Sequence, residues 1–175
     1  MNTPEQRIST QTLALAAVFA ALTYVSTWLI NIRLPLAGTG GLIHLGNVPL
    51  FLAAMLFGPF VGAFAGAVGM GLFDLTGGWT AWAPFTFVIV GLMGYLVGLF
   101  AKKRPLRNRF FNDIFSLLTA LAVKIAGYYL AELILTGNPA APLGSIPGNV
   151  LQDGVSSVIA LGMMPALRKA VRATL

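Results

Sequence analysis

Three side chains that can ionise or form hydrogen bonds recur every four residues in one apolar segment. Lys124, Tyr128 and Glu132 lie in the stretch FFNDIFSLLTALAVKIAGYYLAELILT, residues 110–136. Residues four apart share one face of a helix. A charged side chain at the centre of a bilayer costs about 2.5–3.5 kcal/mol on insertion scales, so it normally faces a partner or a wet cavity. The spacing therefore predicts a polar helix face directed into a membrane protein.

A second polar face is expected on the next apolar segment. It holds two amides, a carboxylate and a hydroxyl: Asn149, Gln152, Asp153 and Ser156. One interpretation is a structural ion pair, in which Lys124 and either Glu132 or Asp153 hold two helices together. The other is a solvated pocket that opens to the outside. We favour the pocket, because three charges, two amides and two tyrosines are more polar groups than an ion pair between two helices requires.

Residues from other segments are expected near the same surface. Asp74, Trp79 and Trp82 lie in a short loop and could close over a pocket, although Trp also anchors helices at membrane interfaces. His44 and Asn47 begin another apolar segment. Because a lone His is more often structural than a metal ligand, and Cys is absent, we expect no metal and no cofactor. The candidate substrate-binding residues are Lys124, Tyr128, Glu132, Asn149, Gln152, Asp153, Trp79, Trp82, His44 and Asn47.

Composition places the chain in a membrane. Of its 175 residues, 57% are hydrophobic and 9% are charged, whereas a soluble domain carries roughly 25% charged residues. The net charge of +6 comes from bases at the ends of apolar segments, which is typical of topology signals and argues against nucleic-acid binding. The sequence has no Walker-type phosphate loop, GxSxG elbow or HExxH motif. We therefore expect a membrane protein that is not an enzyme.

Six apolar segments predict one domain, residues 1–175, folded as an all-α compact bundle of six transmembrane helices. A helix of about 20 apolar residues crosses the hydrocarbon. The second segment is shorter, so we expect it to be tilted or to follow a loop that dips into the protein. The segments run from about residue 9 to 32, 45 to 57, 60 to 75, 84 to 101, 110 to 136 and 148 to 170.

The basic residues predict that both termini are cytoplasmic. With six spans, nine of the eleven bases lie inside, at Arg7, in 102–109 and in 168–172, and only Arg33 lies in an outer loop. The three expected outer loops are 33–44, 74–83 and 137–147, and all are rich in Gly together with Pro or Trp. Ordinary turns explain part of this composition, and loops that fold over a ligand would have the same one.

Small residues four apart let helices pack closely in lipid. The first segment has two such pairs, Ala16 with Ala20 and Ala17 with Ala21, and the third and fourth segments are rich in glycine. These seams predict either packing within the bundle or a docking face for another membrane subunit. The first segment is the better candidate for docking, because a terminal helix is expected at the edge of the bundle.

Between Gly40 and Gly98 the chain shows an ordered set of motifs: a Gly-Gly start, LGN before a short helix, an FGP turn, a Gly-rich helix and the ending FDLTGGW. In these motifs it resembles the substrate-binding S components of energy-coupling factor (ECF) vitamin transporters. The resemblance implies a multi-pass vitamin binder in the cytoplasmic membrane of a prokaryote. It also implies a transmembrane coupling (T) subunit, contacted through the alanine pairs of the first helix, and two cytoplasmic ATPases.

The sequence leaves the vitamin open. Trp79, Trp82 and Tyr128 suit a small ring, which favours a pyridoxine or hydroxymethylpyrimidine type of substrate, whereas Lys124 would suit the carboxylate of pantothenate, and the larger riboflavin is a further alternative. Two other classes compete with this interpretation. One is a stand-alone secondary transporter or channel, and the other is a membrane enzyme that acts on lipid through its acids and Lys124.

Overall fold

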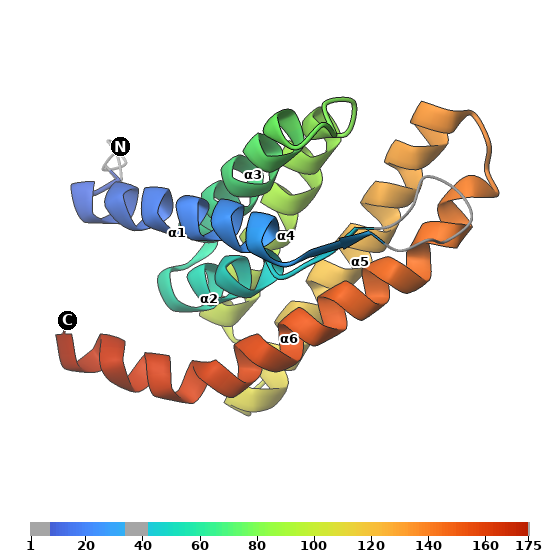
Figure 1. The fold of residues 1–175 in the computed structure, drawn as a ribbon. Coiled ribbons are helices and arrows are strands. Elements are labelled where there is room, and N and C mark those ends of the chain that lie inside the picture. Colours follow the sequence, from blue (N-terminus) through green and yellow to red (C-terminus); the bar gives the residue numbers. More distant parts are fainter. Residues whose placement is uncertain (1–7, 34–41, 175) are drawn as a thin grey trace, which may run out of the picture.

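The computed structural model describes residues 8–33 and 42–174, which form six helices and one short hairpin (Figure 1). Strands β1 (Asn31–Arg33) and β2 (Leu42–His44) pair antiparallel, with Ile32 opposite Ile43. Arg7 and most of the first predicted outer loop lie outside the described residues. The helices are α1 (Thr10–Leu29), α2 (Asn47–Phe57), α3 (Pro59–Thr76), α4 (Ala83–Lys103), α5 (Arg109–Thr136) and α6 (Ala141–Thr174).

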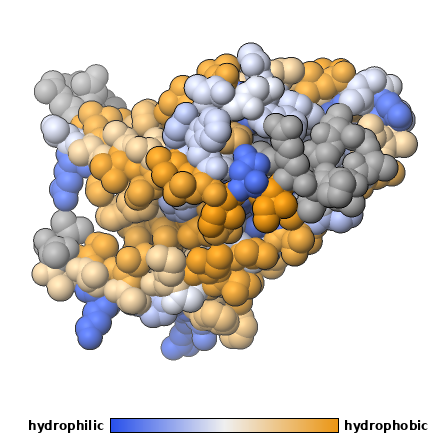
Figure 2. Space-filling model, in the orientation of Figure 1, coloured by the Kyte–Doolittle hydropathy of each residue, from blue (hydrophilic) through white to orange (hydrophobic). Residues whose placement is uncertain are grey.

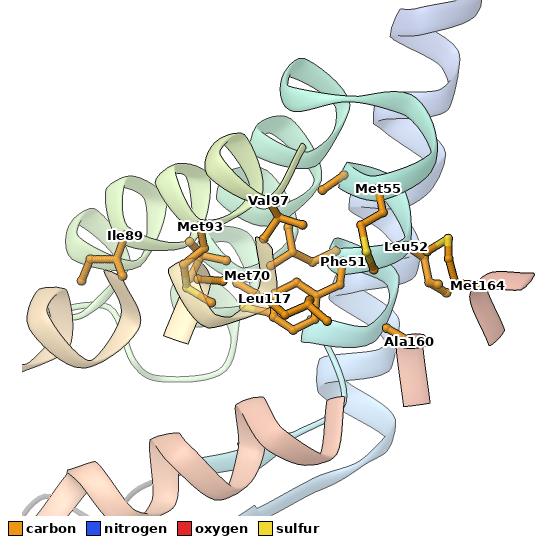
Figure 3. Close-up of a cluster of buried hydrophobic side chains, with 14 of the residues drawn as sticks. Phe51, Leu52, Met55, Met70, Ile89, Met93, Val97, Leu117, Ala160 and Met164 are labelled. Atoms are coloured by element: carbon orange, nitrogen blue, oxygen red, sulfur yellow. The ribbon is translucent and has the colours of Figure 1, made fainter. Parts of the chain in front are cut away.

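Five of these helices, all except α2, are long and apolar enough to cross a membrane. The all-helical class is therefore confirmed, while six spans and cytoplasmic termini stay predictions. Helix α2 has 11 residues, and it packs against α1, α3, α4 and α6. Its side chains Leu50, Phe51 and Ala53 are completely buried. Helix α2 is thus a central core element, and Figure 3 shows Phe51, Leu52 and Met55 packed among residues of the surrounding helices.

Helix α6 differs most from the prediction. It begins at Ala141 and not at about residue 148, so it takes up much of the third predicted loop. Pro147 lies inside the helix. Gly144 and Pro147 predict a loop because proline lacks the N–H that continues a helix, but the packing of α6 against α5 and α2 overrides this local preference. Helix α3 likewise extends to Thr76, so Asp74 is helical and does not begin a loop.

The glycine seams of α3 and α4 serve packing within the bundle. A methyl group on Gly94 would collide with the backbone of Gly62, and one on Gly66 would lie 2.7 Å from the carbonyl oxygen of Val90. Because helix association in lipid depends on such close approach, these glycines hold α3 and α4 together. This outcome is the packing alternative of the two that the sequence allows.

The two ends of the bundle differ in chemistry. Toward the lower left of Figure 1 lie the α2–α3 turn, the α4–α5 connection and the end of α6; we call this the basic end, after the bases in 102–109 and 168–172. Toward the upper right lie the β1–β2 hairpin and the connections 77–82 and 137–140, which form the hairpin end. Figure 2 shows apolar residues over much of the visible face, with strongly hydrophilic residues at its lower edge and at separate places elsewhere.

Candidate functional site

A cavity of about 100 Å³ lies among the helices toward the hairpin end. Five helices, β2 and the α3–α4 connection contribute to its wall, so it depends on the whole bundle and not on one segment. Its lining combines carboxylates, amides, a lysine and aromatic rings: His44, Asn47, Met70, Asp74, Trp79, Trp82, Thr86, Val90, Lys124, Tyr128, Glu132, Ser145, Asn149 and Gln152.

The structure brings the candidate substrate-binding residues together. All of them except Asp153 line this cavity. Asp153 is buried beside it, where its Oδ1 accepts a 2.9 Å hydrogen bond from Nδ2 of Asn47. The faces predicted on α5 and α6 from residue spacing therefore do face each other, and their role in binding a substrate stays a prediction.

A chain of polar contacts crosses the cavity from α5 to β2. The ammonium of Lys124 donates a 2.8 Å hydrogen bond to Oε1 of Gln152, and it lies 4.0 Å from Oδ1 of Asp153. The amide nitrogen of Gln152 in turn lies 3.1 Å from Nδ1 and 2.9 Å from Nε2 of His44. Gln152 is thus the link between the buried cation and the imidazole.

His44 is held as a neutral base. Burial, together with the nearby charge of Lys124, lowers the pKa of His44 to about 3. The backbone N–H of Gly46 donates to Nδ1 of the ring over 3.2 Å. A side chain at position 46 would collide with the hydroxyl of Thr27, so the glycine of the LGN motif is required by close packing against α1. His44 therefore acts as a fixed, uncharged wall of the cavity.

Two further groups give the cavity hydrogen-bonding capacity. The Ser145 hydroxyl donates to Oε2 of the buried Glu132 over 2.7 Å, which orients this carboxylate. The side-chain oxygen of Asn47 is buried and has no hydrogen-bond partner within the described residues. Because an unsatisfied buried acceptor costs roughly 1–3 kcal/mol, a donor on water or on a ligand would stabilise this site.

An aromatic wall completes the cavity. The rings of Trp82 and Tyr128 lie with centroids 6.3 Å apart at an angle of 43°, and Trp79 lines the same cavity. The hydroxyl of Tyr128 is 3.1 Å from that of Thr86, which ties the ring to α4. These rings present flat apolar surface beside the charged groups, a combination that suits a planar polar molecule.

Five lining residues are absent from the predicted site. Ser145 lies on the part of α6 predicted as loop, and the sequence predicts Asp74 only as part of a loop that closes over the pocket. The other three are Met70, Thr86 and Val90. Spacing could have identified four of them, because Met70 with Asp74 and Thr86 with Val90 are pairs four residues apart and so share a helix face.

The alanine pairs of α1 point in different directions. Ala16 and Ala20 are buried inside the bundle, where the backbone of Ala20 lies against Gly69 of α3. They are therefore part of the internal packing and are not accessible to a partner. Ala17 and Ala21 are exposed, so they alone keep the predicted role in docking.

Comparison with known sequences gives a consistent result. A family model described as ECF-type riboflavin transporter, S component, matches residues 7–169. The thiamine precursor transporter HmpT of Lactococcus lactis is 31% identical over 157 residues, which cover 90% of this chain and 87% of that protein. An uncharacterised protein of Pyrococcus woesei is 32% identical over 140 residues, covering 80% of this chain and 91% of its own length.

Solved structures agree on the fold. ThiT of Listeria monocytogenes superposes with a TM-score of 0.70 at 20% identity, covering 91% of this chain and 96% of its own. An S component for biotin from an ECF-type ABC transporter gives a TM-score of 0.68 at 21% identity, with coverages of 97% and 95%. At these identities the likeness shows the fold alone.

Proposed function

Since this chain belongs to the family of ECF-type riboflavin transporter S components, we propose that its cavity binds a vitamin-type molecule with a single heteroaromatic ring, of the hydroxymethylpyrimidine or pyridoxine type. The observation that supports this is the lining of the cavity. A cation, two carboxylates and a flat aromatic wall surround a space of about 100 Å³. That volume holds several water molecules, and so suits a one-ring solute better than the fused rings of riboflavin.

The polar groups match the edges of an aminopyrimidine. Glu132 and Asp74 offer carboxylate oxygens to an exocyclic amine, and Lys124 offers a donor to a ring nitrogen or a hydroxyl. Trp82 and Tyr128 can stack on the ring faces. Among the two favoured substrate types, hydroxymethylpyrimidine has additional support from the relative named as a thiamine precursor transporter.

The alternative substrates fit this cavity less well. Pantothenate carries a carboxylate that Lys124 would attract, but the two acids in the same lining, Glu132 and Asp74, would repel it. Riboflavin is favoured by the name of the matching family, and it would require the cavity to widen.

A direct test measures the tryptophan fluorescence of the purified full-length chain while hydroxymethylpyrimidine, pyridoxine, pantothenate and riboflavin are added separately. Trp79 and Trp82 line the cavity, so a bound ring should quench their emission. We expect hydroxymethylpyrimidine to bind at least tenfold more tightly than riboflavin, a difference of about 1.4 kcal/mol. Tighter binding of riboflavin or pantothenate would overturn this choice of substrate.

We further propose that import of the vitamin is driven by ATPases in partner subunits. The chain acts in the cytoplasmic membrane of a prokaryote as one subunit of an importer, docked through Ala17 and Ala21 of α1 on a T subunit that carries two ATPases. The exposure of this small-residue pair supports this role. The alternative is a stand-alone secondary transporter or channel, which would move the vitamin into liposomes with no other subunit present.

Co-purification tests the docking face. Replacing both Ala17 and Ala21 with Trp should abolish co-purification with the T subunit and the ATPases, because bulky rings block close helix contact, while vitamin binding survives. Val158→Trp is the matched control, since Val158 is 71% exposed on α6. Unchanged co-purification of the α1 variant, or uptake by the chain alone, would contradict this proposal.

A further inference from the structure

A second cavity, of about 410 Å³, lies at the basic end between the start of α5 and the last turns of α6. It shares no residue with the vitamin cavity. Four bases and one acid line it together with apolar side chains: Arg109, Arg168, Lys169, Arg172, Asp113, Phe110, Leu161, Met164 and Pro165.

One base is already neutralised. Nη1 of Arg168 donates to Oδ2 of Asp113 over 2.6 Å, and Nη2 donates to Oδ1 over 2.8 Å. This bidentate pair joins α5 to α6 and fixes the cavity wall. Asp113 is the only acid in the described lining, so Arg109, Lys169 and Arg172 leave a net charge of +3 around the cavity. Three clustered cations favour binding of an anion.

The third nitrogen of the Arg168 guanidinium does not contribute to the cavity. Its Nε is buried and has no hydrogen-bond partner among the described residues, so it is out of reach of a ligand. The attraction for an anion therefore rests on the charges of Arg109, Lys169 and Arg172.

The rest of the cavity lining is apolar. Leu161 and Met164 line the cavity from α6, and Phe110 at the start of α5 is 58% exposed. Pro165 cannot donate a hydrogen bond to the carbonyl of Leu161, which weakens α6 at this point, and Figure 1 shows α6 changing direction toward its C-terminal end. A ligand with both an anionic and a hydrocarbon part matches these surroundings.

We propose that this cavity binds the phosphate group of an anionic membrane phospholipid. The guanidinium groups of Arg109 and Arg172 hold the phosphate oxygens, since arginine matches the geometry of this anion. The first part of an acyl chain lies along Leu161, Met164 and Phe110. Basic pockets between transmembrane helices bind anionic headgroups in this way. The apolar wall favours a lipid over a free phosphate ion, with which it shares the anion chemistry.

Native mass spectrometry of the full chain, exchanged into equimolar phosphatidylglycerol and phosphatidylcholine, tests this. We expect the wild type to retain phosphatidylglycerol with a preference of at least about fivefold, the contribution of a single base near a membrane surface. The variant Arg109→Gln/Arg172→Gln should retain both lipids equally. Both arginines are exposed, so this variant should fold; if it does not, Arg172→Gln alone should lower the preference.

The matched control is Lys102→Gln/Lys103→Gln, which removes the same charge at the same end but outside the cavity lining. It should keep the preference for phosphatidylglycerol. Equal loss in the control would mean a general effect of surface charge and would overturn the site. Displacement of phosphatidylglycerol by excess inorganic phosphate would overturn the assignment to a lipid, and no lipid preference in the wild type would end the proposal.

Discussion

Gln152, and not a carboxylate, holds the buried lysine in place. Its amide oxygen is 2.8 Å from the ammonium of Lys124, whereas Asp153 is 4.0 Å away, at the outer limit of an ion pair. Asp153 is bound instead by Asn47. A strong structural pair would use the carboxylate at short range, so this geometry favours a lysine kept ready for a ligand.

Replacing Lys124 with Met tests whether the ammonium binds the substrate or only stabilises the fold. If the ammonium binds the substrate, affinity should fall at least tenfold, by about 1.4 kcal/mol, because a charged hydrogen-bond donor is lost. Titration of the purified variant with hydroxymethylpyrimidine measures this. Gly154→Ala serves as control, since a methyl group there meets nothing within 4 Å. A variant with lowered thermal stability but wild-type affinity would assign Lys124 to structure alone.

His44 predicts a dependence of stability on pH. Its folded pKa of about 3 lies below the ordinary value of 6.5, so the unfolded chain binds a proton that the folded chain does not. The contribution of neutral His44 is therefore complete above pH 6.5 and is lost as the pH falls toward 3. At about pH 5 the loss amounts to about 2 kcal/mol.

Thermal melting in detergent at neutral pH and at about pH 5 measures this effect. The wild type should melt at a lower temperature in acid, and His44→Gln should show a smaller decrease, because glutamine does not titrate. An equal decrease in both proteins would place the acid sensitivity elsewhere.

At the scale of elements, the contact between α3 and α4 depends on glycine. Gly94→Ala should destabilise the protein by several kcal/mol, because the new methyl group meets the backbone of Gly62, which cannot move aside. Gly162→Ala on α6 meets nothing within 4 Å and should be neutral or stabilise by about 0.5–1 kcal/mol. Thermal melting compares the two, and equal effects would contradict the assignment of this seam to internal packing.

Periodicity predicted some elements well and others poorly. The sequence predicts a helix over 110–136, and α5 spans Arg109–Thr136. This prediction succeeds because a continuous apolar run specifies a membrane helix without information from distant residues. The sequence does not predict the early start of α6, because tertiary packing outweighs the loop preference of Gly144 and Pro147. In the site, too, local features were predicted and features that depend on packing were not. The polar faces of α5 and α6 were predicted from residue spacing. The burial of Ala16 and Ala20 depends on which helix packs against α1, and the local sequence does not determine this.

At the scale of the molecule, the bases concentrate at one end and the proposed vitamin cavity lies toward the other. If the basic end is cytoplasmic, as the positive-inside rule predicts, the cavity faces the outside. The chain has no cysteine, so single cysteines report on each end without background. In intact cells an impermeant maleimide should label Asn138→Cys and should leave Arg107→Cys unlabelled until the cells are opened. The reverse pattern would invert the topology.

The most direct test of the proposed vitamin cavity is to fill it with a bulky side chain and to measure binding. Asn149 lines the cavity, while the adjacent Val150 is 41% exposed and absent from its lining, so tryptophan at each position adds the same bulk in two environments. Isothermal titration with hydroxymethylpyrimidine should show one binding site in the wild type and in Val150→Trp, and no measurable binding to a folded Asn149→Trp. Wild-type affinity in Asn149→Trp would show that the ligand binds elsewhere.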